Sequence, residues 1–432
     1  MLNAFVSAFK TPDLRRKILF TLGIIAMMRV GSVLPTPGID VRAVNTCLKP
    51  ALSGGNSVYG MVNLLSGGAL LKLSVLALGI MPYITASIII QLLTVVIPRL
   101  ETLKKEGQSG TTKITQYTRY LTVGLAILQS TTIVALARPV GQLFQGCNED
   151  LIPDESIATL ATMVLTMVAG TALVMWFGEL ITDRGVGNGM SVLIFTSIAA
   201  SFPTALWQIK ISHGWATFLL VLAIGLVIMA GVIFIEQAQR RIPVQYAKRM
   251  VGSRSLGGSS TYIPLKVNQA GVIPVIFASS LLYLPVLLAQ FNQGSAWGTW
   301  ISVNFTRGDH PAYIITYFLL IIFFAYFYVS ITFNPEEVAD NMKKYGGFIP
   351  GIRAGRPTQE YLSYVLSRIT LPGSLYLGLI SMVPIIALVL INANQNFPFG
   401  GTSILIMVGV GLDTVKQIES QLQQRRYEGF LR

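Results

Sequence analysis

The residue types that carry out covalent or metal chemistry are scarce in this chain. Its only histidines are His213 and His310, and neither has a second ligand residue at the spacing that a metal site requires. No GxxxxGKS or GxxxxGKT stretch is present, so we do not expect the chain to hydrolyse nucleotides itself. The GVGNGMS run at 185–191 is superficially like a dinucleotide fingerprint, but it follows an apolar run and lacks the last glycine. We interpret it as a tight turn before a helix, and we expect a protein that is not an enzyme and has no cofactor or metal.

Ionisable side chains near the middle of apolar runs would be expected of a solute transporter, because substrates and coupling ions need polar ligands there. In this chain such residues lie toward the ends of the runs, where snorkelling to the membrane surface explains them: Arg29, Glu179, Glu236 and Asp413. The apolar centre favours a pore for polypeptides of any sequence. A short aliphatic constriction binds no side chain strongly and blocks water and ions by dewetting. Most isoleucines in the runs are nevertheless expected to face lipid or other helices.

The composition identifies a membrane protein. Of 432 residues, 52% are hydrophobic and 12% are charged, against roughly 25% charged residues in soluble domains. We predict an all-α polytopic protein in which each run crosses the roughly 30 Å apolar layer as a helix. The first run is read as a retained span, because no clean cleavage site follows it. The ten predicted spans are 18–34, 73–97, 116–137, 157–178, 188–207, 215–236, 270–291, 312–333, 370–391 and 401–418.

The basic residues predict the orientation of these spans, because loops rich in lysine and arginine stay in the cytoplasm. With a cytoplasmic N-terminus, the cytoplasmic segments hold 25 of the 32 lysines and arginines, and both termini are cytoplasmic. The spans divide at about Trp207 into an N-terminal half, 1–207, and a C-terminal half, 208–432. Five spans in each half would give the halves opposite topologies, as in inverted repeats that surround a central pathway. The two cysteines, Cys47 and Cys147, then lie in external loops, which permits a disulfide, although two cysteines define no framework and free thiols are the simpler interpretation.

Two cytoplasmic loops are too long to be simple connections. Segment 237–269 alternates bulky and basic residues like a β-hairpin with its turn at Gly257 and Gly258. In segment 334–369, Pro335 is expected to open a short helix that ends at Gly346. Both loops could be solvated segments that only set the topology. Their length and aromatic residues favour docking elements, whose positive charge suits an acidic partner.

The stretch from 64 to 96 is unusual because Pro82 interrupts its apolar run and small residues precede it. In lipid such breaks survive only where protein or water satisfies the freed backbone groups. The break therefore points toward a cavity, and the small residues could form a re-entrant packing segment.

The order of residues over the whole chain resembles the SecY family, the channel subunit of the Sec protein translocon. The resemblance begins with SGGAL, ALGIMPYI and IIIQLLTVV in the second span. It continues with KKEGQSGTTKITQYTRY, GELITDRGVGNGMSVLIF, QRRIPVQYAKR, PLKVNQAGVIPVIFASS, FNPEEVADNMKKYGGFIPGIR and FGGTSILI.

The resemblance implies two inverted five-helix halves around a central pore, with functional residues at matched positions. The implied pore ring is Ile80, Ile84, Ile194, Ile276 and Ile406. The plug helix of the resting channel matches 64–73, including Ser66, Gly67, Gly68, Ala69 and Leu70. The lateral gate lies between the second and third spans and the seventh and eighth spans, with Ser87, Gln91 and Gln129 as candidates to face it. The implied docking residues are Arg353, Arg254, Lys248 and Arg249.

The resemblance also implies the activity and the partners. The chain would translocate signal-bearing unfolded polypeptides and release apolar helices into lipid through the lateral gate. It would work with SecE, a SecG-type subunit, the SecA motor and the ribosome, whose RNA the basic loops would contact. The membrane would be a bacterial plasma membrane or a thylakoid membrane, with cytoplasmic or stromal termini. Two alternatives are a secondary solute transporter and a static scaffold or insertase without a pore.

Overall fold

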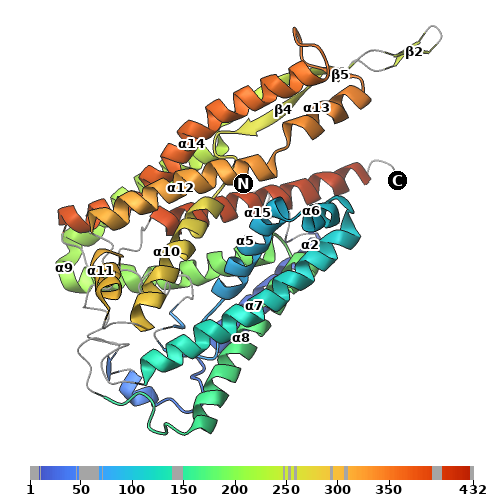
Figure 1. The fold of residues 1–432 in the computed structure, drawn as a ribbon. Helices are drawn as coiled ribbons and strands as arrows, with labels where there is room; N and C mark the ends of the chain where they lie inside the picture. Colours follow the sequence, from blue (N-terminus) through green and yellow to red (C-terminus); the bar gives the residue numbers. More distant parts are fainter. Residues whose placement is uncertain are drawn as a thin grey trace.

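The computed structural model describes most of the chain and consists mainly of helices (Figure 1). The described residues are 9, 11–44, 46–47, 68–70, 72–138, 149–246, 249–251, 254–256, 260–291, 295–305, 310–391 and 401–428. The helices are α2 (Pro12–Val33), α5 (Met81–Val96), α6 (Pro98–Lys105), α7 (Gln108–Ala137), α8 (Ile157–Arg184), α9 (Gly189–Gln237), α10 (Ile273–Phe291), α11 (Ala296–Phe305), α12 (Pro311–Thr332), α13 (Pro335–Lys344), α14 (Arg356–Ile391) and α15 (Gly401–Glu428). The strands are β1 (Gln239–Tyr246), β2 (Arg249–Val251), β3 (Arg254–Leu256), β4 (Ser260–Lys266) and β5 (Gly347–Phe348).

Several helices meet the length and hydropathy that a membrane span requires. Within the described residues there are four, and a fifth if α5 and α6 are one span bent by 100°. The four are Ile157–Arg184, Gly214–Gln237, Pro311–Lys344 and Arg356–Val383. The prediction of a polytopic helical membrane protein is therefore confirmed, while the number of ten spans stays a prediction.

The second predicted span is shorter as a helix than expected. The prediction of a helix over 73–97 is wrong at its start, because residues 72–80 form turns and α5 begins at Met81. Pro82 lies in the first turn of α5 and does not break the middle of a helix. Proline is tolerated there because the first N–H groups of a helix have no intrahelical partner.

Backbone contacts hold the turns before α5 in place. The Val75 N–H donates to the Leu34 carbonyl at 2.9 Å, just beyond α2. On α8, Gly170 approaches so closely that a Cβ built on it would lie 2.0 Å from the Val75 carbonyl oxygen. The absence of a side chain at Gly170 thus lets α8 pack directly against the backbone of this segment.

Two predicted spans, 188–207 and 215–236, both lie in α9, which consists of two helices joined at a kink at Gly214. Gly214 has φ 80° and ψ −179°, a conformation that glycine adopts without the steric cost of a Cβ. The turn predicted at 185–191 is confirmed, because Asn188 caps the start of α9 and Gly187 has φ 89°. Trp207, the predicted boundary between the halves, lies inside α9. The division into 1–207 and 208–432 stays a prediction.

The two long loops fold together into one appendage, which we define as the sheet β4-β1-β5, the hairpin β2–β3 and α13. Strand β1 pairs with β4 along its length and with β5 through Gln245 opposite Phe348. Buried residues from both loops form a shared core with the start of α14, so these loops are not merely solvated connections: Ile242, Val244, Leu265, Met342, Ile349, Leu362 and Val365. The predicted hairpin and the helix at Pro335 are both confirmed.

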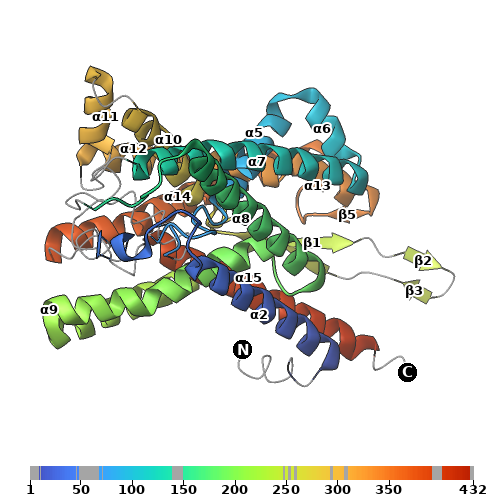
Figure 2. The same cartoon turned by 90° about the horizontal axis from the view of Figure 1, so that it is seen from below.

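The turn of the hairpin was predicted at the wrong position. Val251 pairs with Arg254, so the chain reverses between these two residues and not at Gly257 and Gly258. Gly257 and Gly258 lie outside the described residues. Figure 2 shows β2 and β3 projecting from the rest of the molecule.

The expectation of free thiols is also wrong, because Cys47 is disulfide-bonded. Cys147, the only other cysteine of the chain, lies outside the described residues. A disulfide is typical of an oxidising compartment, which agrees with the external position that the basic residues predict for the loop of Cys47.

Candidate functional site

The five isoleucines of the expected ring come together in one hydrophobic cluster. Ile80, Ile194, Ile276 and Ile406 are buried members of this cluster, and Ile84 packs against it. Their exposed fractions run from 2% to 7% for the four buried side chains. They come from the turn before α5, from α9, from α10 and from α15, so both predicted halves contribute.

Other helices support this cluster from outside. Ile24 and Met28 of α2 and Val174 and Phe177 of α8 are buried in it. The buried members of the cluster all have hydrocarbon or thioether side chains. The expectation of an apolar centre for the whole protein stays a prediction.

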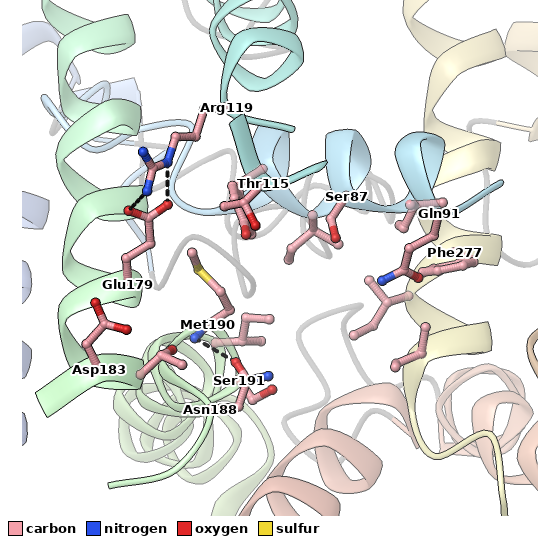
Figure 3. Close-up of a pocket in the computed structure, with 17 residues that line it drawn as sticks. Ser87, Gln91, Thr115, Arg119, Glu179, Asp183, Asn188, Met190, Ser191 and Phe277 are labelled. Atoms are coloured by element: carbon pink, nitrogen blue, oxygen red, sulfur yellow. Dashed lines mark hydrogen bonds and ion pairs between the residues drawn. The ribbon is translucent and has the colours of Figure 1, made fainter. Parts of the chain in front are cut away.

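A cavity of about 470 Å³ adjoins the cluster (Figure 3). Ile84, Ile194 and Ile276 form part of its wall, so the cavity ends at the cluster. The cavity also touches the turn at Asn188, which connects α8 to α9. The predicted orientation would place this turn, and the cavity beside it, on the cytoplasmic side.

Two of the three predicted gate residues line this cavity. Ser87 and Gln91 lie on α5, and Phe277 of α10 faces the same cavity (Figure 3). Ile88 of α5 is buried in one cluster with Phe277, so the contact between α5 and α10 is apolar with a polar margin. Gln129 is 9% exposed on α7 and does not line the cavity.

An ion pair forms the opposite wall of the cavity. The Arg119 guanidinium of α7 donates two hydrogen bonds to the Glu179 carboxylate of α8, at 2.8 and 2.7 Å (Figure 3). Asp183 lies one turn further along α8 on the same wall. The cavity thus has an apolar end at the isoleucines and charged groups at its side. The bidentate geometry fixes α7 against α8.

Three of the four charged residues that were assigned to snorkelling bind protein groups instead, namely Arg29, Glu179 and Glu236. The Arg29 guanidinium donates to the Thr196 carbonyl at 2.6 Å and to the Ser197 carbonyl at 3.3 Å, both on α9. Glu179 pairs with Arg119, as described above. These side chains bind protein groups because membrane helices in contact offer partners that the lipid does not.

The other two of these charged residues, Glu236 and Asp413, line a second cavity, which has a volume of about 560 Å³. The Glu236 carboxylate accepts a hydrogen bond from Asn268 Nδ2 at 2.5 Å, and both residues are buried. Asp413 lies 3.6 Å from the Lys266 ammonium. The first contact joins the end of α9 to the segment before α10, and the second joins the root of the appendage to α15.

The described part of the predicted plug consists of turns. Leu70 is buried in a hydrophobic cluster with Cys47, Ala69 is also buried, and Gly68 has φ 87°. Ser66 and Gly67 lie outside the described residues.

The predicted docking residues belong to the appendage or adjoin it. Arg353 is exposed in the turn between β5 and α14. Arg249 begins β2 and Arg254 begins β3, near the tip of the hairpin. Lys248 lies outside the described residues.

Sequence reasoning missed the Arg119–Glu179 pair and Phe277 as parts of one cavity. Arg119 and Glu179 are far apart in the sequence, and no periodic pattern connects them. The only available signal was that each lies within a motif quoted above for the family resemblance.

Comparisons with known proteins agree with the geometry. A family model described as SecY matches residues 74–415. The protein translocase subunit SecY of Streptomyces galbus is 70% identical over 439 residues, covering 100% of both chains. A solved structure of a protein-conducting channel is similar with a TM-score of 0.62 and 15% identity, covering 94% of this chain and 91% of that one. Sec61 in the canine ribosome-channel complex is similar with a TM-score of 0.60 and 15% identity, covering 94% and 91%.

Proposed function

Because the chain belongs to the SecY family, we propose that it is a protein-conducting channel. It moves unfolded, signal-bearing polypeptides across a membrane and releases apolar helices sideways into lipid. The chain is not an enzyme, so the energy for transport comes from a partner. Family membership does not favour the alternative of a secondary solute transporter.

The observation that carries this proposal is the convergence of five isoleucines from separate parts of the chain. An aliphatic constriction lets varied polypeptides pass and excludes ions by dewetting when it is empty. The β-branched isoleucine side chain is stiff, which suits a seal that must close again after each passage. The ring therefore consists of Ile80, Ile84, Ile194, Ile276 and Ile406.

The lateral gate opens between α5 and α10, beside the cavity. Ser87 and Gln91 give the closed contact a mildly polar margin, and Gln129 supports it from α7. Each Leu or Ile at the centre of a signal helix gains roughly 0.3 to 0.6 kcal/mol in lipid, so about ten such residues gain several kcal/mol. That gain is sufficient for a signal sequence to leave through an opened gate.

The plug of the resting channel is formed by 64–73. The burial of Ala69 and Leu70 supports a segment packed inside the protein. Displacing this segment would open the external side of the ring.

The appendage is the docking surface for cytoplasmic partners. Its exposed Arg353 and the basic hairpin with Lys248, Arg249 and Arg254 suit the ribosome, whose RNA is acidic, and the SecA motor. The similar Sec61 structure is itself part of a ribosome-channel complex, which supports this assignment. SecE and a SecG-type subunit complete the channel.

The membrane is a bacterial plasma membrane, with both termini in the cytoplasm. The high identity to a Streptomyces protein supports this choice over a thylakoid. The excess of basic residues in the predicted cytoplasmic segments supports the orientation.

A photo-crosslinker at Ile276 tests the channel. We expect it to crosslink a precursor that is stalled on the ribosome or trapped with the motor, and only when the precursor has a signal sequence. Val227 is the matched control, because its side chain is 73% exposed on α9 and does not belong to the cluster. A channel is contradicted if partner complexes form but Ile276 yields no crosslink, and solute uptake would then be measured.

A further inference from the structure

The short helix α11 exposes an apolar face that is poorly suited to water. Its ten residues include no Asp, Glu, Lys or Arg. Trp297, Trp300 and Val303 are exposed by 48%, 59% and 61%, and their spacing of three residues places them on one side of the helix. Phe305 packs instead against the largest core cluster. A helix that faced water would carry charged or polar residues on its exposed side.

The position of α11 in the fold is at one end of the membrane-spanning helices. It lies between α10, which ends at Phe291, and α12, which starts at Pro311, and it contacts both. The other end of α12 leads directly to α13 of the appendage. Helix α11 is therefore on the side of the molecule opposite the appendage (Figure 1).

The same end of the molecule carries two more exposed tryptophans. Trp207 and Trp215 flank the bend of α9 at Gly214 and are 58% and 63% exposed. The Lys210 ammonium lies 3.9 and 4.0 Å from the centres of their rings. Helices α9 and α11 both reach the left side of the molecule in both views (Figures 1 and 2). Tryptophan and lysine are typical of the membrane–water interface.

The membrane-spanning helix α12, which contacts α11, also exposes apolar side chains. Near the start of α12, Ile315 and Leu319 are each 59% exposed. These side chains belong to a span that meets the criteria for crossing a membrane. The exposed face of α11 thus adjoins the surface that the hydrocarbon layer covers.

We propose that α11 is an interfacial helix whose face of Trp297, Trp300 and Val303 inserts into the lipid leaflet on the side opposite the appendage. The ligand is the phospholipid bilayer itself, at the depth of the headgroups and the first acyl carbons. Because α11 packs on α10, this contact ties the helix that carries Ile276 to the membrane surface.

Tryptophan quenching in vesicles tests the proposal on the full chain. In a variant with Trp176→Phe, Trp207→Phe and Trp215→Phe, the emission comes from Trp297 and Trp300. The protein is reconstituted in phosphatidylcholine–phosphatidylglycerol vesicles whose lipids carry bromine at shallow or deep acyl carbons. We expect shallow bromines to quench the emission more than deep ones, and aqueous iodide to quench it weakly.

Two other outcomes would overturn the proposal. Strong iodide quenching without bromine quenching means that α11 faces water. Protection from both quenchers that increases with the ratio of protein to lipid means that a second copy covers the face.

A matched pair of variants at Val303 adds a control for folding. Val303→Asp should lose the bromine quenching and gain iodide quenching, whereas Val303→Leu should leave both unchanged.

Discussion

At the scale of single residues, Arg29 of α2 binds the backbone of α9 close to one of the ring isoleucines. Its guanidinium donates to the carbonyls of Thr196 and Ser197, two and three residues after Ile194 of the ring. Like Arg29, Ile24 and Met28 lie on α2, and both are buried in the cluster that contains the ring isoleucines. Arg29 therefore acts as a positioning residue that holds the ring segment of α9 against α2.

Replacing Arg29 should loosen the ring. We expect Arg29→Leu to raise the ion conductance of the resting channel, since a lost hydrogen bond to a charged donor costs about 1.5 to 3 kcal/mol. Arg29→Lys keeps a cationic donor, so we expect its resting conductance to lie between those of Arg29→Leu and the unmodified chain. The measurement is single-channel conductance in a planar bilayer, with Met27→Leu, at a position 62% exposed on α2, as the control. Equal conductance of Arg29→Leu and the unmodified chain would show that this contact does not position Ile194.

At the scale of elements, the close approach of α8 to the turns before α5 determines where Ile80 lies. A Cβ at Gly170 would lie 2.0 Å from the Val75 carbonyl oxygen and 3.2 Å from a methyl group of Leu76. Backbone cannot yield as a flexible side chain does, so a side chain at Gly170 must push the two elements apart. Ile80 belongs to the segment that would move.

Gly170→Ala should therefore impair the seal although alanine favours the helix. We expect lower thermal stability and a higher resting ion conductance. Gly231→Ala on α9 is the matched control, because a Cβ there has no atom within 4 Å and alanine should stabilise that helix by about 0.5 to 1 kcal/mol. If Gly170→Ala is as stable and as tight as Gly231→Ala, the contact does not determine the position of the ring segment.

At the scale of the whole molecule, the appendage and the membrane-embedded part have separate cores. The appendage core combines both long loops with the start of α14, whereas the ring cluster joins residues from both predicted halves. A change on the appendage surface can therefore affect docking without disturbing the constriction.

Reversing the charge of Arg353 should separate these two roles. We expect Arg353→Glu to insert into the membrane at the normal level but to fail to transport precursors, because an acidic side chain repels an acidic partner. The measurement is precursor uptake into inverted membrane vesicles together with the amount of inserted protein. Lys344→Glu makes the same change of charge at an exposed position at the end of α13 and should have a smaller effect. Normal transport by Arg353→Glu would contradict docking at this position.

The sequence by itself determined the class of the protein and most of its elements. Long apolar runs with few charges require a membrane, because the hydrophobic effect decides this from composition alone. Local signals also placed the helix at Pro335, the turn before Gly189 and the hairpin of the appendage, since proline, asparagine and glycine impose their conformations locally. The ring isoleucines followed from the family resemblance, since their side chains do not differ from those that face lipid.

Only the tertiary structure decided which distant residues meet. The start of α5 at Met81, the pairing of β1 with β5 and the partners of Arg29 and Glu179 all depend on contacts between segments far apart in the chain. A charged side chain near a helix end has the same local pattern whether it reaches lipid headgroups or another helix. Which partner it finds depends on the packing of the helices, and no pattern within one segment records that packing.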